Sequence, residues 1–197
     1  MLTSNIIETE RLKLMTFDPA QHLNDTYVAW LNDPDVVRYS EQRHKSHTLE
    51  SCAAFTESFN DSPSHLWAIM QKTDNRHIGN IHADIDPHNG IADVAILLGA
   101  RDTWDQGYGL EAWNGVLGHL KSHEDIRKII AGCMRSNAAM YSIMTKSGMI
   151  DDGQRQKHYF LDGKPEILYS LRCKSLPDPC AEADFNSEHP KIAQDRS

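Results

Sequence analysis

The chain has 197 residues, which is enough for one domain with a substantial core and short for two. Its formal net charge is −8 at pH 7, and because an acidic surface repels phosphate backbones, no binding to nucleic acid is expected. No segment has the roughly 20 apolar residues that span a bilayer, and the sequence MLTSNIIETE is too polar for a signal peptide. The four cysteines form no CxxC pair and no zinc spacing, which predicts a cytoplasmic protein with reduced thiols and no membrane partner.

The first third of the chain predicts one strand followed by helices. Apolar and polar residues alternate from Arg11 to Phe17, as they do in a half-buried strand. Asp18 and Pro19 begin a helical stretch, because proline is favoured in a first turn. An irregular, charged segment follows, and Thr48 is the expected cap of a second helix.

The middle of the chain predicts a sheet. Residues 65–71, 77–85 and 91–99 have strand character, and the turn-forming stretches TDNR and DPHNG separate them. This spacing is typical of an antiparallel meander.

The second half of the chain predicts helices and strands in alternation. Its expected elements are a helix from Gly107 to about Lys121, a buried strand over 128–134, a helix from Asn137 to Lys146, and strands near 154–161 and 166–173. The pattern stops at Ser175. We therefore expect one α+β domain over residues 1–174 and a polar tail over residues 175–197.

The loop TWDQGYGLEAW, residues 103–113, raises the question of a phosphate site. Gly107 and Gly109 stand where the next helix begins, and glycines there let N–H groups point outward toward an anion. The stretch also fits the dinucleotide fingerprint G-x-G-x-x-A, which requires its first glycine directly after a strand. Seven residues separate Gly99 from Gly107, and the preceding strands form an antiparallel meander, so a Rossmann domain is rejected.

Two motifs in order around a strand carry a family resemblance. The loop pattern W-G-K-G-Y-A/G-x-E-A corresponds to the nine residues from Trp104 to Ala112. The pattern N-x-x-S-x-x-x-x-x-K-x-G-F corresponds to Asn137, Met140, Lys146, Gly148 and Met149. Over roughly residues 8–173 the chain resembles the GNAT superfamily of N-acetyltransferases, and within it the branch of ribosomal-protein-alanine acetyltransferases and their amino-sugar relatives.

The resemblance implies a fold and a cofactor. The fold is a mixed, mostly antiparallel twisted sheet of about seven strands, with helices on both faces and a splayed central strand pair. The cofactor is acetyl-CoA, whose pantetheine arm enters between the splayed strands and whose pyrophosphate lies at the loop. The residues it implies for cofactor binding are Ile96, Leu97, Leu98, Trp104, Gln106, Gly107, Tyr108, Gly109, Leu110, Asn137 and Lys146.

The implied reaction is direct attack of a primary amine on the acetyl thioester in a ternary complex. The amine is largely protonated at neutral pH, so a base is needed, whereas a thiolate leaves without obligatory help. Relatives use Ser or Tyr as the proton donor, but Met140 and Met144 stand at those positions and neither can donate. Tyr141 is the remaining candidate, although on a helix it is rotated by about 100° from Met140.

Three residues are candidates for the base that takes the proton of the acceptor amine. Asp93 occupies a position that is often acidic in relatives, and Glu41 lies in RYSEQRH, which resembles the Y-L-E-x-R stretch of the amino-sugar branch. His82 has the side chain whose pKa best suits base work at neutral pH. Glu41 and Asp93 are the first choices, and Tyr39, Glu41, Arg43 and His82 are the expected substrate-binding residues.

The acceptor stays open between an amino sugar and a protein or peptide N-terminus. The histidine pairs at 44 and 47 and at 119 and 123 lack a third ligand at a recognisable spacing, so no catalytic metal is expected. A monomer or homodimer is expected. The alternative function is a non-catalytic acyl-CoA-binding or partner-binding module, favoured by Met140 and Met144.

Overall fold

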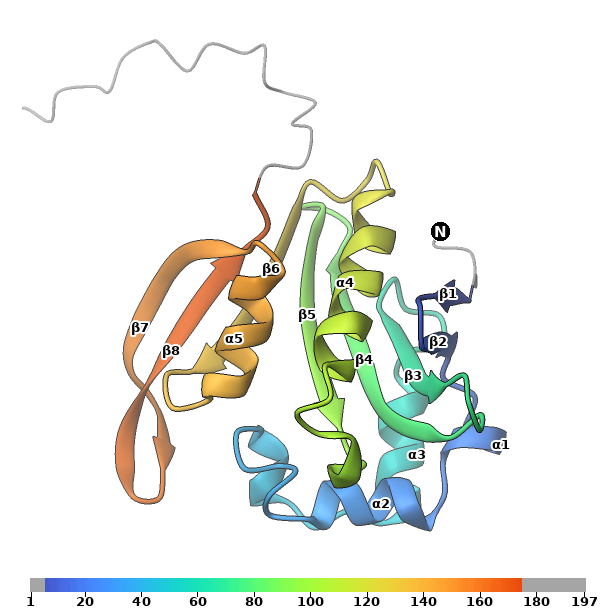
Figure 1. Cartoon of the computed structure of the whole chain (residues 1–197). Helices are drawn as coiled ribbons and strands as arrows, with labels where there is room; N and C mark the ends of the chain where they lie inside the picture. The colour runs from blue at the N-terminus through green and yellow to red at the C-terminus, as the bar shows by residue number, and fades with distance from the viewer. Residues whose placement is uncertain (1–5, 175–197) are drawn as a thin grey trace, which may run out of the picture.

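An open sheet of eight strands runs through residues 6–174, which are the residues that the computed structural model describes (Figure 1). In spatial order the strands are β1 (Ile7–Glu8), β2 (Leu12–Thr16), β3 (His65–Gln71), β4 (His77–Asp86), β5 (Ile91–Leu98), β6 (Lys128–Met134), β8 (Lys164–Arg172) and β7 (Ile150–Leu161). Every neighbouring pair is antiparallel except β5 and β6. The mixed, mostly antiparallel α+β fold is thereby confirmed. The expected tail, residues 175–197, lies outside the described residues.

The count of strands exceeds the expectation by one. The additional strand β1 has two residues, paired with Leu14 and Lys13 of β2. Two residues are too few to show the alternation by which a strand is recognised in a sequence.

Three short helical segments and four longer helices connect the described strands. They are α1 (Pro19–His22), α2 (Asp25–Asn32), η1 (Glu41–His44), α3 (Leu49–Glu57), η2 (Arg101–Thr103), α4 (Tyr108–Lys121) and α5 (Ala138–Lys146). The helical stretch expected after Pro19 is divided, because Leu23 is extended and Asn24 caps a new helix by accepting from the Tyr27 N–H. Thr48 caps α3 in a reciprocal pair with Ser51, as its position predicts.

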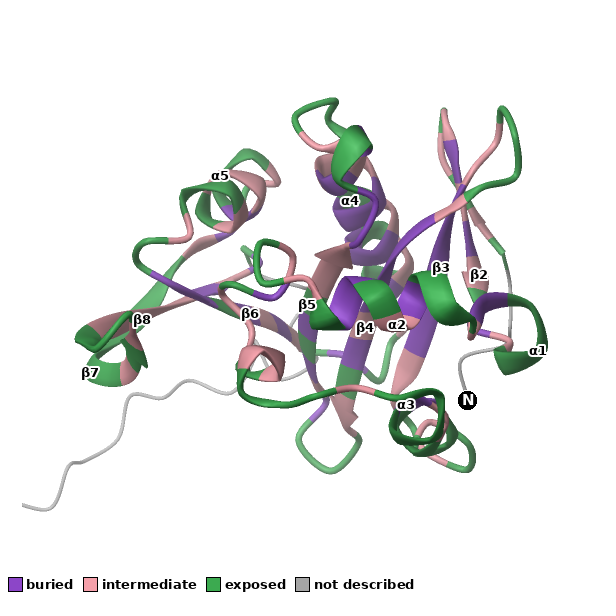
Figure 2. Ribbon diagram, turned by 90° about the horizontal axis from the view of Figure 1, so that it is seen from below, coloured by how far each residue is buried: buried purple, intermediate pink, exposed green. Residues whose placement is uncertain are grey.

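The helices cover both faces of the sheet. Helices α4 and α5 lie on one face, α3 lies on the other, and α2 crosses the end of the central strands (Figures 1 and 2). The expected apolar stripe of α4 is buried, with Trp113, Val116 and Leu120 each 0% exposed. Burial of these side chains fixes α4, and therefore the loop before it, against the sheet.

The parallel strands β5 and β6 separate along their length. Their pairing covers three positions, Ile91 with Lys128, Ala92 with Ile129 and Asp93 with Ile130. Beyond these, β5 stays paired with β4 to Leu98, and β6 stays paired with β8 to Met134. The central pair is therefore splayed, as expected, and each strand has an edge without a strand partner.

The end of β5 packs so closely on α2 that only glycine fits. A Cβ added to Gly99 would overlap the indole ring of Trp30. We predict that Gly99→Ala lowers the free energy of unfolding by about 1–3 kcal/mol, because the indole or the strand must move. Gly118→Ala is the matched control: its Cβ meets nothing within 4 Å, and alanine favours the α4 helix by about 0.5–1 kcal/mol. Denaturant unfolding measures both changes, and opposite signs are expected.

Candidate functional site

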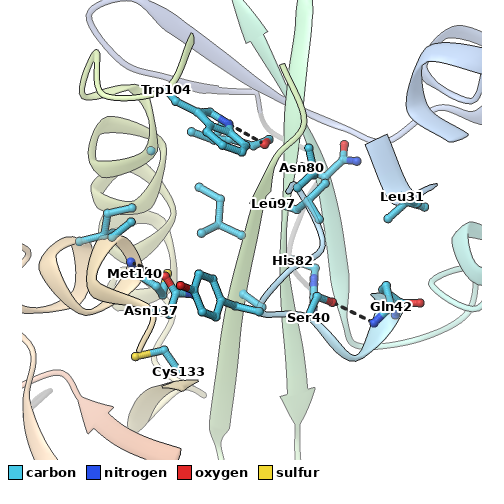
Figure 3. Close-up of a pocket in the computed structure, with 18 of the residues that line it drawn as sticks. Leu31, Ser40, Gln42, Asn80, His82, Leu97, Trp104, Cys133, Asn137 and Met140 are labelled. Atoms are coloured by element: carbon cyan, nitrogen blue, oxygen red, sulfur yellow. Dashed lines mark hydrogen bonds between the residues drawn. The ribbon is translucent and has the colours of Figure 1, made fainter. Parts of the chain in front are cut away.

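A cleft of about 830 Å³ opens where β5 and β6 separate. One side is formed by the end of β5, residues 103–110, and the first turns of α4 and α5. The other side is formed by α2, residues 35–47, α3 and β4. Figure 3 shows Asn137 and Met140 of α5 across the cleft from His82 and Asn80 of β4. The cleft thus extends from the splayed strands to the part that is bounded by α2, residues 35–47, α3 and β4, which we call the chamber.

The beginning of α4 offers backbone donors to this cleft. Gly107 has φ +82°, a left-handed conformation that glycine adopts without strain, and its carbonyl accepts from the Glu111 N–H at 3.0 Å. No described residue accepts a hydrogen bond from the N–H groups of residues 107–110. These groups lie at the positive end of a helix of 14 residues, which favours an anion.

Arg11, near the N-terminus, forms hydrogen bonds with this loop and with the first turn of α4. Its Nε donates to Glu111 Oε2 at 2.6 Å, and its Nη1 donates to the Gln106 carbonyl at 3.0 Å. Thr9 Oγ1 and the Arg11 N–H both donate to Glu111 Oε1 at 2.6 Å. Burial alone would raise the pKa of Glu111, but these hydrogen bonds outweigh it and the pKa is lowered. The carboxylate is therefore ionised at neutral pH and fixes the loop.

The open edge of β5 has backbone groups that face the cleft. Gly99 donates its N–H to the Ile78 carbonyl of β4 at 3.0 Å, and the pattern of an antiparallel pair alternates. The backbone groups of Leu97 therefore face β4, whereas those of Ile96 and Leu98 face the opening. The indole Nε1 of Trp104 donates to the Leu98 carbonyl at 3.0 Å, as Figure 3 shows, so Trp104 stabilises the end of the open edge.

Most of the residues expected to bind the cofactor line the cleft. They are Ile96, Leu97, Leu98, Trp104, Gly107, Tyr108, Gly109, Leu110, Asn137 and Lys146. Gln106 is the exception, because its side-chain amide donates to the Asp102 carbonyl and its own carbonyl is bound by Arg11. No carboxylate in residues 6–174 lies within 4 Å of the Lys146 ammonium, which leaves it available to an anion.

The expected acceptor residues divide into two groups. Tyr39 and His82 line the cleft, whereas Glu41 and Arg43 do not. Arg43 donates to the carbonyls of Ser40 at 2.8 Å and Phe160 at 3.0 Å and pairs with Glu41 at 2.8 Å. These contacts attach η1 to the tip of the β7–β8 hairpin. Glu41 and Arg43 are thus next to the lining residues Ser40 and Gln42 without lining the cleft themselves, and their contact with the acceptor stays a prediction.

His82, Asp84 and Asp93 form a titratable cluster beside the chamber. They line a second cavity of about 240 Å³ that shares His82 with the main cleft. His82 Nε2 lies 3.6 Å from Asp84 Oδ2, and Asp84 is opposite Asp93 in the β4–β5 register. Burial lowers the pKa of His82, although Asp84 opposes this effect. Asp93 lines the second cavity and is in part open to solvent; partial desolvation, and then the charge of Asp84, raise its pKa to about 6.

The candidate proton donor does not lie in the cleft. Tyr141 is 42% exposed, its ring centroid lies 5.5 Å from that of Tyr169, and it does not line the cavity. Met140 lines the cleft at the position where relatives have serine, and Met144 is 0% exposed in the core. Ser142 lines the cleft together with Met140, whereas Tyr141 does not, and a role for Tyr141 as proton donor stays a prediction.

The comparison with known proteins identifies the family. A family model described as "Acetyltransferase (GNAT) domain" matches residues 11–150, which is more than half of the chain. The chain belongs to the GNAT acetyltransferase family. The GNAT chain is accordingly an acyl-CoA-dependent N-acetyltransferase whose cofactor is acetyl-CoA.

Solved structures of low sequence identity share the GNAT fold. The ribosomal L7/L12 alpha-N-protein acetyltransferase RimL, in complex with coenzyme A, is 15% identical with a TM-score of 0.76, covering 85% of this chain and 97% of that one. A GNAT-family acetyltransferase from Bacillus anthracis is 20% identical with a TM-score of 0.72 and the same coverage. Spermidine N-acetyltransferase from Vibrio cholerae, with CoA and spermine, is 13% identical with a TM-score of 0.74, again covering 85% and 97%. A search of curated proteins finds no match.

The described residues fit acetyl-CoA in this GNAT cleft. The unpartnered N–H groups of residues 107–110 suit a diphosphate, and the open edge of β5 suits an arm that carries amides. In residues 6–174 no helix has the length and apolar character to cross a membrane, and no group of three His, Cys, Asp or Glu side chains is arranged to hold a metal ion.

Two residues at or next to the site were not predicted from the sequence. Arg11 is 100 positions from Glu111, and nothing local to either residue indicates that they pair. Asn80 lines the cleft as a buried polar residue of β4. A signal for Asn80 existed, because alternation places it on the same strand face as His82 and Asp84.

We predict that Gly107→Val abolishes binding of coenzyme A, because a branched side chain at the N-cap of α4, with its Cβ 3.5 Å from Arg11 Nη2, would crowd the proposed diphosphate site. Gly148→Val is the matched control, since Gly148 also has φ +82° but lies outside the cleft. Both variants carry the same backbone strain, of order 1–3 kcal/mol. Titration calorimetry should show lost affinity only for Gly107→Val. Equal affinities in the two variants would mean that the loop is not the phosphate site.

Proposed function

We propose that the protein transfers the acetyl group of acetyl-CoA to a primary amine by direct attack in a ternary complex. The observation that carries this proposal is the continuity of one cleft, which joins the open edge of β5 to a chamber under α2 and α3. A molecule held at the first part and an amine held in the second would meet without a covalent enzyme intermediate. Proximity of this kind lowers the barrier substantially without a dedicated nucleophile.

The cofactor would be held mainly by backbone groups. The N–H groups of residues 107–110 would bind the diphosphate, with Lys146 nearby, and the backbone of Ile96 and Leu98 would bind the pantetheine arm. Asn137 caps α5 through its Oδ1, which accepts from the Met140 N–H at 3.1 Å, and its Nδ2 is left for the arm. Bound in this way, acetyl-CoA supplies an activated acetyl thioester.

His82 is the base that the geometry favours. It lines the chamber, and its lowered pKa keeps the imidazole neutral at pH 7, so it is ready to accept a proton from the acceptor ammonium. Asp84, whose Oδ2 lies 3.6 Å from His82 Nε2, would stabilise the imidazolium that forms. Glu41, which its sequence context favours as the base, is less favoured by its position, because its carboxylate pairs with Arg43 outside the cleft.

No general acid is required by this proposal. The departing thiolate has an intrinsic pKa near about 8.5, so its departure is feasible at neutral pH without a donor. Met140 lies beside the cleft where a hydroxyl stands in relatives, which agrees with a donor-independent departure.

The acceptor is a primary amine, either of an amino sugar or of a protein or peptide N-terminus. RimL is named for a ribosomal protein and the Vibrio cholerae enzyme for spermidine, so amines of different shapes are represented among the neighbours. We also propose a cytoplasmic location, which the buried, unpaired Cys52, Cys133 and Cys173 support, and a monomeric or homodimeric state.

The alternative function is a non-catalytic module, and the absence of a hydroxyl at Met140 is the observation that favours it. Thiol release from acetyl-CoA with a panel of amines separates the two functions. Amine-dependent release supports the enzyme. Tight binding of acetyl-CoA without release for any amine supports the module, and no binding at all would contradict both.

We predict that His82→Gln lowers kcat by about 10²–10⁴-fold, because the proton acceptor is lost. Glu41→Gln should leave kcat within about twofold. The affinity for acetyl-CoA, measured by calorimetry, should be unchanged in both. A large loss of kcat in Glu41→Gln with none in His82→Gln would move the base to the rim of the chamber.

We also predict an acidic limb in the pH profile of kcat. Asp93 has a pKa of about 6, and that of His82 is below its usual value, so both groups gain a proton as the pH falls through this region. Protonation of His82 removes the base, and kcat should therefore decrease at pH values below the usual pKa of a histidine. In Asp84→Asn the limb should move to lower pH, because the imidazolium loses the carboxylate that lies 3.6 Å from its Nε2. A profile that is identical in this variant would show that Asp84 is not coupled to the base.

A further inference from the structure

Asn80 has a side-chain amide whose oxygen has a hydrogen-bond partner, whereas its nitrogen Nδ2 has none among the described residues. The residue is 6% exposed, lies on β4 opposite Leu97 of β5, and lines the cleft. Figure 3 shows its carboxamide extending from β4 toward the side of the cleft that holds Leu31. No described residue accepts a hydrogen bond from its Nδ2. Asn80 Nδ2 is not one of the fully enclosed polar atoms without a partner, so this donor is accessible from the cleft, where a ligand with an acceptor atom can bond to it.

His77 determines which end of this amide faces the cleft. His77 Nε2 lies 3.0 Å from the Gly79 carbonyl and 2.9 Å from Asn80 Oδ1. The Gly79 oxygen can only accept, so Nε2 carries the proton and donates. The Asn80 atom beside it must then be the oxygen, and Nδ2 points to the cleft as a donor.

The surroundings of His77 keep this orientation fixed. Its ring is packed among the rings of Phe17, His22, Tyr27 and Trp30, with centroids 5.0–6.4 Å away. Burial lowers the pKa of His77, so the imidazole stays neutral at physiological pH. No carboxylate in residues 6–174 pairs with it or with His22, whose Nδ1 accepts the Asp18 N–H at 2.8 Å. The donor at Asn80 is therefore preorganised.

We propose that Asn80 Nδ2 donates a hydrogen bond to an oxygen atom of the acceptor, so that the acceptor is a primary amine that also carries a carbonyl or hydroxyl oxygen. This inference rests on the proposed acetyl transfer. Asn80 of β4 lines the cleft, and Figure 3 shows it on the same side of the cleft as Leu31 of α2, across from Asn137 and Met140. The neighbouring lining residues Leu31, Phe55 and Leu66 provide an apolar surface for the rest of the acceptor.

The preference has a physical basis in hydrogen-bond polarity. An amide N–H attracts an oxygen and repels an ammonium group. An amine whose other polar groups are all ammonium therefore leaves Nδ2 unpaired in the chamber, whereas an amino-acyl amide or an amino alcohol satisfies it.

The test exchanges the donor for an acceptor at constant shape. Asn80→Asp preserves the bond from His77 but replaces Nδ2 by an oxygen, and Asn80→Leu removes both polar atoms. Asn114→Asp, on the exposed face of α4, is the matched control for the change of charge. KM for the acceptor and for acetyl-CoA is measured with alanyl-alanine amide and with 1,4-diaminobutane, after a thermal melt and calorimetry with coenzyme A confirm that each variant folds.

For alanyl-alanine amide, both Asn80 variants should raise the acceptor KM by about tenfold or more, with the KM of acetyl-CoA unchanged. For the diamine, Asn80→Asp should lower the acceptor KM, and Asn114→Asp should change neither. Acceptor KM values within twofold of the parent in both variants, or a rise in the KM of acetyl-CoA alone, would overturn the inference while leaving acetyl transfer intact. Failure of the parent chain to acetylate any amine would overturn the proposed function itself.

Discussion

The separation of β5 from β6 is the constraint on which the site depends. Parallel pairing ends at Asp93 and Ile130, and each strand continues with one edge paired and one edge bare. Unpaired N–H and C=O groups inside a protein are costly, so such an edge persists only if something else bonds to it. The protein satisfies one such group itself, the Leu98 carbonyl, through the Trp104 indole. The remaining groups of this edge are open to the cleft, and in the proposed complex the pantetheine arm would bond to them.

The two halves of the cleft are built by different means. On the cofactor side, the donors are backbone groups whose positions follow from helix and strand geometry. On the acceptor side, the polar groups are side chains, and each is oriented by a second residue: His77 orients Asn80, and Asp84 lies behind His82. Substitutions of side chains therefore affect the acceptor side more readily, and a common cofactor is compatible with varied acceptors.

The fold could be predicted from the sequence because its signals are local, and most residues of the loop over 103–110 line the cleft, as the resemblance implies. Glycine at 107 and 109, the capping Asn137 and the strand periodicities are each visible within a few residues. The acceptor side was predicted less well, since the direction in which a loop residue points depends on distant contacts. Glu41 and Arg43 face the β7–β8 tip instead of the chamber because the Phe160 carbonyl holds Arg43. The partnership of His77 with Asn80 depends on a tautomer that no sequence pattern reveals.

The bonds between Glu111 and residues 9–11 have a consequence for how the protein is made. They join parts of the chain separated by 100 and 102 positions, so they form only after α4 has been synthesised and has returned to the first strands. Contacts between such distant segments are among the slower steps of folding. The loop before α4 should thus become fixed late in folding, and a coenzyme that binds only the folded chain would stabilise it by mass action.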